Sequence, residues 1–582
     1  MEHQNLEKMA STAPMLPKEN DEKIVIITPS HVGVGKILIR EDTVIGNIQG
    51  CAACGRGQFT CTGVKNQWST LCWGKLSDRK YYTLLVLLSA TFVLSLIGTI
   101  CFCFTNTIND AVLSSMVIRK DSIAYSIWQH PNVQPLMKVR LFNYTNWDEV
   151  RLGLETKLHV EEVGPYVYSQ DLERVNVEFD NDRLTFQELN HFRYIPERTN
   201  GAHFDQVIVP NLPLLGVVSK AVTHVSELLQ FPLDSALQWS DHPQAFVKLP
   251  VHRFLWGYDD SIINTAKPFL SFLGQWKFDK FGLLSSKNGT LSEKFTINTG
   301  ENDKDKMNRI EAVDGKDHLT YWSSTDCNSL ESTDGSIFPP SLLDRKTTLH
   351  IFYPQLCRRI PYVFDRDVEI SDGIQLLRYR MPHNVFDDPE HNPANQCYCE
   401  IDSGTCPPKG VINVTECSMG APALVSFPHF YQGDPRLLEE VSGLKPDPEL
   451  HDSYLDFHPT LGIALNGKSS LQINIQVRKT SRFSVLRRLE EGLILPVAWL
   501  EIGIEELPES LRTLVYHGTY STAAMQLGLS VFCIFALIIS GICLIIMFER
   551  RRQKICAKVK KIAVETELKT PSSQPQNIMN NT

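Results

Sequence analysis

Residues Leu84–Phe104 read LLVLLSATFVLSLIGTICFCF, a stretch of 21 residues without a charge. A second uncharged stretch, Leu527–Phe548, reads LGLSVFCIFALIISGICLIIMF over 22 residues. At about 1.5 Å per residue each helix would run roughly 30 Å, the thickness of the hydrocarbon core of a bilayer. The first stretch begins too far from the N-terminus for a cleaved signal peptide. The sequence therefore predicts two membrane-spanning helices, at 84–104 and 527–548.

The charges beside these helices indicate their orientation. Lys75, Arg79 and Lys80 precede the first span, and Arg550–Arg552 with Lys554 follow the second. The opposite flanks, 105–118 and 513–526, contain no Lys or Arg. Basic flanks remain in the cytoplasm. We therefore expect a cytoplasmic, largely disordered tail at 1–83, an extracellular or luminal domain at 105–526, and a second cytoplasmic tail at 549–582.

Composition and motifs exclude several classes of protein. The formal net charge of −9 argues against a generally basic nucleic-acid binder. Gly33-Val34-Gly35-Lys36 lacks the first Gly and the following Ser/Thr of a phosphate loop. The chain contains no Gly-x-Ser-x-Gly elbow and no His, Cys and carboxylate set at a catalytic spacing. We expect no enzyme activity, no cofactor and no nucleic-acid partner.

Residues 105–526 contain cysteines and glycosylation acceptors in a pattern typical of proteins exposed to an oxidising, secretory compartment. Six of the fifteen cysteines lie there, all within 327–417: Cys327, Cys357, Cys397, Cys399, Cys406 and Cys417. An even number in an oxidising compartment favours three disulfides and leaves their pairing open. A zinc site is the alternative, but no His follows at finger spacing, so no metal is expected. Glycosylation acceptors occur at Asn143, Asn288 and Asn413, whereas Asn580 falls in the inner tail and should be silent.

The tails hold cysteines of another kind. Cys51 and Cys54 have metal-site spacing, but Cys61 and Cys72 do not continue it, which favours free or acylated thiols. Cys556 follows the arginine cluster, a position that favours palmitoylation.

Most signals in the outer region are those of strands. Leu471–Val477 alternates apolar and polar residues, which predicts one buried face made of Leu471, Ile473, Ile475 and Val477. Leu349–Tyr353 and Val160–Tyr168 are further β-rich runs, the latter broken by Gly164-Pro165. Apolar residues recur at helical spacing over Leu214–Leu229, and Pro232 lies just beyond. This helix either faces the core or helps admit an apolar ligand.

A series of collinear motifs resembles the class B scavenger receptor family. They are Phe142-Asn143-Tyr144-Thr145-Asn146, Glu162-Val163-Gly164-Pro165-Tyr166-Val167-Tyr168, Leu255-Trp256-Gly257-Tyr258, Lys280-Phe281-Gly282-Leu283-Leu284, Phe338-Pro339-Pro340, Asn395-Gln396-Cys397-Tyr398-Cys399 and Ser426-Phe427-Pro428-His429-Phe430-Tyr431. The resemblance runs from the first span to the second. Members of this family include a fatty-acid translocase, a lipoprotein receptor, a lysosomal integral membrane protein, and insect sensory-neuron and carotenoid-uptake proteins.

The resemblance implies an α+β fold for the outer domain. Its core would be an irregular antiparallel β-barrel with an internal apolar tunnel, and a membrane-distal helical bundle would form the head at about 211–258. It also implies the disulfide pairs Cys327–Cys397, Cys357–Cys417 and Cys399–Cys406. The two longer pairs would hold the chain over the barrel, and the short pair would close a loop.

The function implied is binding of lipophilic ligands and their uptake or transfer through the tunnel. The candidate contacts are apolar residues of the head: Leu228, Leu229, Phe231, Trp239, Phe246 and Leu249. Lipoprotein-binding members carry a lysine cluster in the head, but here only Lys220 and Lys248 occur, with Glu227, Asp234 and Asp241 close by. A small, mostly neutral lipid of the fatty acid, sterol ester or carotenoid class is therefore favoured over an anionic lipoprotein particle.

Two other functions and several locations stay open. A trafficking receptor that binds a luminal protein through its head is one alternative, although neither tail carries an acidic-dileucine signal. A two-span ion channel subunit is another, but neither span has an ionisable residue to line a pore. We expect a plasma-membrane protein, with the endosomal or lysosomal membrane as the alternative location, and leave homo-oligomer formation open.

Overall fold

The computed structural model describes residues 78–239, 244–264, 280–370, 373–399, 405–418, 420–505 and 507–567. The expectations for most of the tail at 1–83, including its four cysteines, and for Asn580 therefore lie outside the described residues. The part from Asp78 onward forms one compact unit of strands with helices at both ends.

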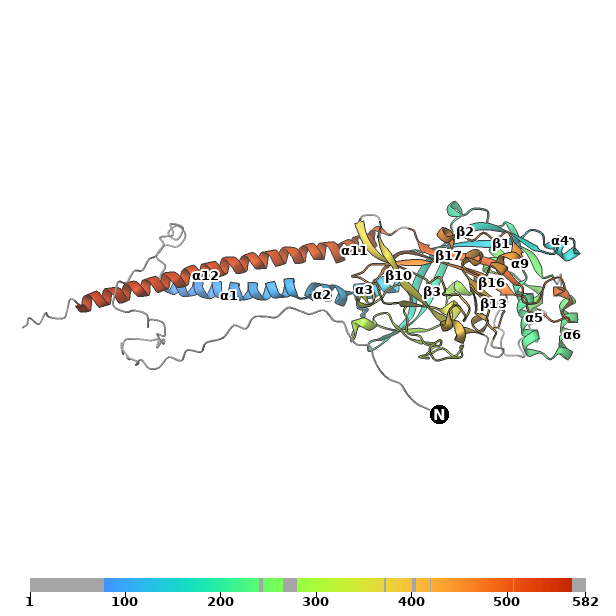
Figure 1. Ribbon diagram of the computed structural model, residues 1–582, viewed down its shortest axis with the longest axis horizontal. Coiled ribbons are helices and arrows are strands. Elements are labelled where there is room, and N and C mark those ends of the chain that lie inside the picture. Colours follow the sequence, from blue (N-terminus) through green and yellow to red (C-terminus); the bar gives the residue numbers. More distant parts are fainter. Residues whose placement is uncertain are drawn as a thin grey trace, which may run out of the picture. The chain divides into compact units, whose positions relative to one another are not determined.

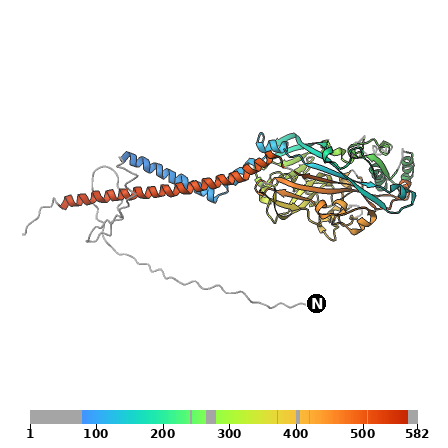
Figure 2. The same ribbon diagram turned by 90° about the horizontal axis from the view of Figure 1, so that it is seen from above.

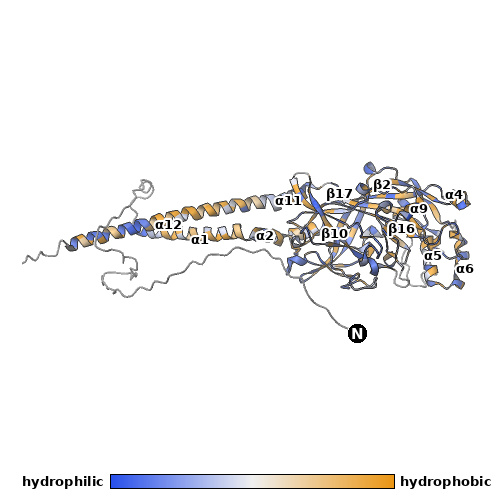
Figure 3. Cartoon of the chain, in the orientation of Figure 1, coloured by the Kyte–Doolittle hydropathy of each residue, from blue (hydrophilic) through white to orange (hydrophobic). Residues whose placement is uncertain are grey.

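Two long helices, α1 (Asp78–Phe104) and α12 (Thr522–Glu567), are long and apolar enough to cross a membrane. They lie side by side, and their apolar stretches stand out in Figure 3. Each contains one of the stretches expected to span the bilayer. Gly98 permits the close approach, because a Cβ at this position would lie 2.6 Å from the Cys533 sulfur. Small residues serve this purpose where lipid surrounds both helices.

Short helices join the anchors to the strands and cover the far end of the domain. Next to the anchors lie α2 (Thr107–Met116), α3 (Ile123–Gln129) and α11 (Glu509–Tyr516). The other α-helices are α4 (Trp147–Leu152), α5 (Leu212–His224), α6 (Glu227–Gln238), α7 (Val251–Trp256), α9 (Pro435–Glu440) and α10 (Pro448–His451). In Figures 1 and 2, α5 and α6 lie at the end of the strand domain away from α1 and α12.

The strands build one large sheet and a separate hairpin. The paired path is β8-β7-β3-β2-β1-β17-β16-β15-β11-β10-β9, with β12 and β13 attached through β16. Its long members are β1 (Leu136–Tyr144), β2 (Leu158–Asp180), β3 (Arg183–Tyr194), β10 (Arg358–Ile370), β11 (Ile374–Arg380), β16 (Ala464–Gln476) and β17 (Ile494–Ile504). Its short members are β6 (Gly289–Thr290), β7 (Phe295–Asn298), β8 (Ile310–Val313), β9 (Leu349–Tyr353), β12 (Val411–Asn413), β13 (Ala423–Ser426), β14 (Val441–Ser442) and β15 (Tyr454–Phe457). The hairpin pairs β4 (Gln206–Pro210) with β5 (Phe246–Pro250).

Pairing along this path is antiparallel, and the path does not close on itself among the described residues. Its two edges nevertheless approach each other through one segment. The Ile310 N–H of β8 donates to the Ser332 carbonyl (2.9 Å), and the Phe352 N–H of β9 donates to the Thr333 carbonyl (2.9 Å). The sheet also curls, since the Tyr353 hydroxyl of β9 lies 3.3 Å from the Ser469 hydroxyl of β16.

The two largest apolar cores hold the sheet and its covering elements together. One joins β1, β2 and β17 to the helices of the head through residues such as Val139, Tyr166 and Leu214. The other joins β9–β11 to β12, β13 and β15 and includes Tyr362 and Phe457. Each of these five side chains is essentially withdrawn from solvent. Apolar burial of this kind provides most of the driving force for folding.

Three expectations about local structure need correction. The strand β2 is continuous through Gly164-Pro165, because Gly164 adopts φ +112° at a point where a Cβ would lie 2.8 Å from the Val139 carbonyl. The helix expected at Leu214–Leu229 is two helices that break between His224 and Glu227. As part of the same correction, the second helix includes Pro232, whose missing N–H costs one backbone hydrogen bond.

The third correction concerns the alternating strand. Ile475 and Val477 are buried as expected, but Leu471 and Ile473 are only partly buried, whereas Ser470, Gln472 and Asn474 are fully buried. The polar face is buried because its groups find partners: the Gln472 side chain accepts the His429 N–H (2.7 Å), and Asn474 donates to the Ser426 hydroxyl (3.0 Å). Alternation locates the strand correctly, but it does not tell which face is covered when the polar face is hydrogen-bonded.

Three disulfides lie in the region 327–417. They join Cys327 to Cys397, Cys357 to Cys417 and Cys399 to Cys406. The indole N–H of Trp322 donates to the Cys357 carbonyl (2.6 Å) in a small core beside the two longer bridges. Long bridges restrict the unfolded chain most, so we expect these two to contribute more to stability than the short one.

Candidate ligand-binding head

The head is built from α5 and α6 over the hairpin β4–β5. The start of α5 is set by Asn211, whose side chain accepts the Leu214 N–H (3.2 Å), followed by Pro213 in the first turn. Most of α5 is buried, including Leu214, Leu215 and Val218. This helix is therefore the core-facing one, which leaves α6 as the outer layer of the head.

An apolar stripe lies exposed on α6 and the residue that follows it. Leu228 is 84% exposed, Phe231 64% and Trp239 92%. Their spacing of three and eight residues places them on one side of the helix. We call these three residues the α6 stripe. Leaving three large apolar side chains in water gives up about 2 kcal/mol each compared with burial, so this surface favours contact with something apolar.

The other candidate contacts lie elsewhere. Phe246 is buried in the main core, with its ring 4.4 Å from that of Trp147 and 4.6 Å from that of Tyr144. Leu249 packs partly buried against the same core. The side chain of Leu229 lies outside the described ones. The structure thus brings Leu228, Phe231 and Trp239 together on the surface and assigns Phe246 and Leu249 to packing.

Acidic residues of the head were expected to weaken its electrostatic attraction for anions. They contribute less negative surface charge than the sequence indicates. Asp234 is buried: it accepts from the Ser484 N–H (3.2 Å), the Ser484 hydroxyl (3.2 Å) and the Gln238 amide (2.7 Å). Its charge therefore fastens α6 to the segment around Ser484. Glu227 is exposed but lies 4.0 Å from Arg482, and Asp241 lies outside the described residues.

That contact reveals a basic segment that sequence reasoning missed. The short helix η11 (Ser484–Leu486) packs beside α6, and the Thr480 hydroxyl donates to Gln230 of α6 (2.9 Å). Exposed arginines stand on both sides of η11, namely Arg482, Arg487 and Arg488. The run of basic residues was visible in the sequence, but it lies about 250 positions from α6. Only the fold brings it to the head.

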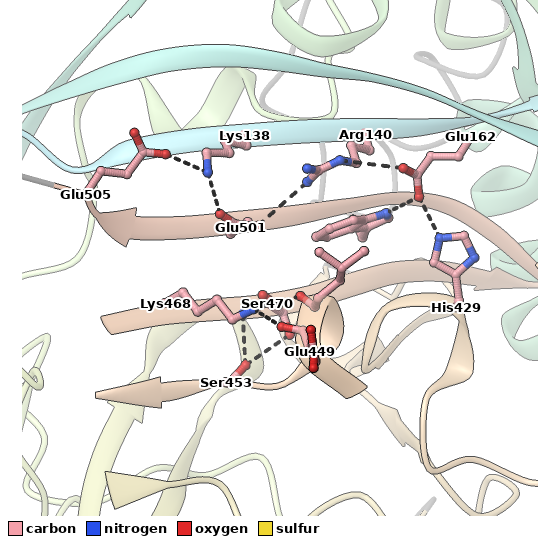
Figure 4. A network of polar contacts seen from close by, with 12 residues as sticks. Lys138, Arg140, Glu162, His429, Glu449, Ser453, Lys468, Ser470, Glu501 and Glu505 are labelled. Carbon is pink, nitrogen blue, oxygen red and sulfur yellow. Dashed lines mark hydrogen bonds and ion pairs between the residues drawn. The ribbon is translucent and has the colours of Figure 1, made fainter. Parts of the chain in front are cut away.

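A second polar cluster crosses the sheet below the head (Figure 4). From β1, the Lys138 ammonium lies 2.7 Å from both Glu501 and Glu505, and the Arg140 guanidinium lies 3.5 Å from Glu162 of β2. The Arg140 guanidinium also lies 4.2 Å from the ring centre of Trp499. Cross-strand pairs of this kind help to fix the register of neighbouring strands.

Glu162 is the centre of this cluster. It accepts hydrogen bonds from His429 Nε2 (2.6 Å) and from the indole N–H of Trp499 (2.8 Å). Burial acts to raise the pKa of the Glu162 carboxyl, but these bonds and the Arg140 charge outweigh it, so its pKa lies below the ordinary value. The other ring nitrogen of His429 accepts the Lys445 N–H (3.0 Å), so Nε2 carries the proton. Sequence reasoning missed this pair because 267 positions separate its members.

Two of the cavities among the described residues are lined by residues other than those of the α6 stripe. One of about 310 Å³ is lined by Asn176, Glu178, Phe186 and Lys294 on β2, β3 and the start of β7. The other, of about 20 Å³, lies between Arg358 and Asp387 near the disulfides. Neither has the extent of an apolar tunnel.

The candidate modification sites fall at the surface or near it. The three acceptors Asn143, Asn288 and Asn413 each use the side-chain oxygen to accept a backbone N–H, from Ile208, Phe192 and Thr415 respectively. The side-chain nitrogen, to which a sugar is attached, takes no part in these three hydrogen bonds. Cys556 is exposed on α12 beyond the apolar stretch.

Comparison with known proteins shows the family to which this chain belongs. The model of the CD36 family matches residues 87–548. This chain belongs to the CD36 family. Its match to lysosome membrane protein 2 of Mus musculus is 31% identical over 447 residues and covers 74% of this chain and 88% of that protein. Its match to scavenger receptor class B member 1 of Cricetulus griseus is 32% identical over 396 residues and covers 68% and 75%.

Family membership resolves the broad class of the protein. This CD36-family chain is a two-span membrane protein of the class B scavenger receptor type, with a mixed domain of antiparallel strands and helices between the two spans.

Proposed function

We propose that this protein is a receptor, not an enzyme, which binds lipophilic ligands at its head and mediates their uptake or transfer. The observation that carries the proposal is the α6 stripe, three large apolar side chains exposed at the end of the domain away from the anchors. An apolar ligand would gain about 25 cal/mol for each Å² of surface it buries there. The bilayer reached by α1 and α12 offers a sink for the same ligand.

The route that we propose runs through the interior of the curled sheet towards the membrane. In support, the Ser332–Thr333 segment hydrogen-bonds to both edge strands, and side chains of β9 and β16 meet across the sheet. Both features fit an irregular barrel that encloses an apolar tunnel.

The head's charges bear on the class of cargo. We propose a fatty acid, sterol ester or carotenoid, taken up singly or from a lipoprotein particle. Arg482 is paired with Glu227 of α6, and the exposed Glu490 and Glu491 follow Arg487 and Arg488, so the charges of this segment do not favour an anionic lipid over a neutral one. A neutral lipid would use the stripe without the arginines.

We further propose the domain arrangement that the charges beside the spans predict. Residues 105–526 lie outside, the tails at 1–83 and 549–582 lie in the cytoplasm, and the protein resides in the plasma membrane or in an endolysosomal membrane. The basic run after Phe548 supports this orientation.

Lipid uptake by cells that express the full chain tests the proposal. The ligands are a fluorescent fatty acid, a cholesteryl ester and a carotenoid. We expect Leu228→Ser/Phe231→Ser/Trp239→Ser to reduce uptake of at least one ligand by more than tenfold, because the loss of about 2 kcal/mol of apolar contact at one residue already exceeds the roughly 1.4 kcal/mol of a tenfold change. The matched control replaces three exposed apolar residues away from the head, Ile123→Ser/Leu342→Ser/Leu450→Ser, and should retain uptake.

Surface labelling normalises uptake to the amount of receptor. Uptake of all three ligands unchanged by the stripe variant would contradict the assignment of the head. Expression without any gain in uptake, together with capture of a luminal protein by the head, would favour the trafficking alternative instead.

A further inference from the structure

The helix α12 continues well beyond the membrane. On the side opposite the ectodomain, the Arg551 guanidinium donates to the Tyr82 hydroxyl of α1 (2.8 Å) and lies 5.4 Å from the Tyr81 ring centre. Tyrosine and arginine side chains mark the interface between hydrocarbon and water. From Arg551 the helix runs to Glu567, a further distance of roughly 24 Å at about 1.5 Å per residue. Figure 3 shows this end as the polar part of α12.

This extension has two faces. Ile555, Val559 and Ile562 recur at spacings of four and three, so they form one apolar stripe, and they are 54%, 61% and 60% exposed. Basic residues occupy most of the other positions from Arg550 to Lys561: Arg550, Arg551, Arg552, Lys554, Lys558, Lys560 and Lys561. Between Arg550 and Val564 the sequence has no acidic residue. The segment is thus a basic amphipathic helix joined directly to a membrane span.

The charges decide what fits this surface. Pairing the apolar stripe with that of a second copy would bring two rows of lysines and arginines together, which is unfavourable. A bilayer surface with anionic lipids complements both features, since it takes the apolar stripe at the headgroup boundary and the lysines at the phosphates. We propose that the segment Arg552–Ile562 binds the anionic lipid headgroups of the leaflet in which α12 ends.

Binding of this segment to the bilayer surface requires α12 to bend. In the structure the helix is continuous, so Lys558, Lys560 and Lys561 stand farther from the bilayer than a screening length of about 8 Å. To lie along the surface the helix bends after Arg551. The inference needs only that α12 crosses a bilayer and does not rest on the proposed lipid uptake.

Hydrogen–deuterium exchange of the full chain in nanodiscs tests this. One set of discs contains phosphatidylcholine alone, and the other an equal mixture of phosphatidylcholine and phosphatidylserine. Nanodiscs present the same lipids on both faces, so the orientation of the chain does not matter. We expect amides of 555–564 to exchange roughly tenfold more slowly in the mixed discs, because the segment is held at the surface.

Two triple variants distinguish the effect of the lysine charges from any effect of substitution on the helix itself. Lys558→Gln/Lys560→Gln/Lys561→Gln should exchange equally in both discs, whereas Lys558→Arg/Lys560→Arg/Lys561→Arg should keep the full difference. Equal exchange of the unmodified chain in both kinds of disc would overturn the proposal. So would protection that follows the number of chains per disc and not the lipid charge, because that result indicates pairing of two copies.

Discussion

Two buried histidines serve the fold as neutral acceptors. His451 Nδ1 accepts the Asp447 N–H (2.9 Å), and His458 Nδ1 accepts the N–H groups of Thr460 and Leu461 (both 3.2 Å). Burial lowers the pKa of His458 to about 4, and burial together with His429 lowers the pKa of His451 to about 4. A protonated ring would lose the acceptor that these backbone groups need.

The depressed pKa values make the stability of the strand domain depend on pH. An unfolded histidine takes up its proton near pH 6.5, whereas folded His458 does so only near pH 4. Between these values the unfolded state binds more protons, so the free energy of unfolding falls as the pH falls. The stability that neutral His458 contributes is present above about pH 6.5 and declines by up to about 3 kcal/mol towards pH 4.

Replacing His458 by asparagine should remove part of this pH dependence. The side-chain oxygen of the introduced asparagine can accept the same two N–H groups without titrating. We expect His458→Asn to reduce the fall in melting temperature of the detergent-solubilised full chain between pH 7 and pH 4.5. His191→Asn, a change at an exposed histidine, is the control and should keep the full fall. If the melting temperature of His458→Asn falls as much as that of the unmodified chain, other titrating groups dominate the pH dependence of stability.

At the scale of elements, the pairing of α1 with α12 depends on small residues. Gly98 faces Cys533, and Gly541 of α12 lies opposite the ring of Phe92. The Ser530 hydroxyl and the Gln526 amide both reach the Phe102 carbonyl, at 3.4 and 3.1 Å. Polar groups bonded between helices contribute about 0.6 kcal/mol each in a membrane, so close packing carries much of the association.

A cysteine introduced in place of Gly98 should report this packing directly. We expect Gly98→Cys to form a disulfide with Cys533 on mild oxidation of the full chain in membranes, because a Cβ at this position lies within reach of that sulfur. The cross-linked peptide pair is identified by mass spectrometry after proteolysis. Gly528→Cys is the control, since a side chain there meets open space and should give no link to α1. Absence of the link between the introduced thiol and Cys533 would mean that the two helices do not pack as described.

The packing of α5 and α6 also explains why the structure of the head was only partly predictable from the sequence. The apolar spacing of 214–229 correctly places helices there, but it does not separate the buried face of α5 from the exposed face of α6. The break between them depends on tertiary packing, in which Asp234 and Gln230 bind the segment around Thr480 and Ser484.

At the scale of the whole molecule, the topology can be tested through glycosylation. We expect Asn143→Gln, Asn288→Gln and Asn413→Gln each to remove one glycosidase-sensitive increment of mass from the protein made in cells, because the sugar is added only outside the cytoplasm. Asn580→Gln is the control and should change nothing, as that acceptor lies in the tail expected inside. Loss of a glycan in Asn580→Gln would place the C-terminus outside and overturn the orientation.

What the sequence determined by itself is whatever depends on neighbouring residues. The two spans follow from an uninterrupted apolar length, and the β-rich runs at Leu349–Tyr353 and Leu471–Val477 follow from local alternation. What only the tertiary structure decided involves partners far apart along the chain. It set Arg482 beside α6, joined Glu162 to His429, buried the polar face of β16 and separated the exposed Phe231 from the packed Phe246. The physical reason is that burial and charge pairing are properties of the space around a side chain, which local pattern does not contain.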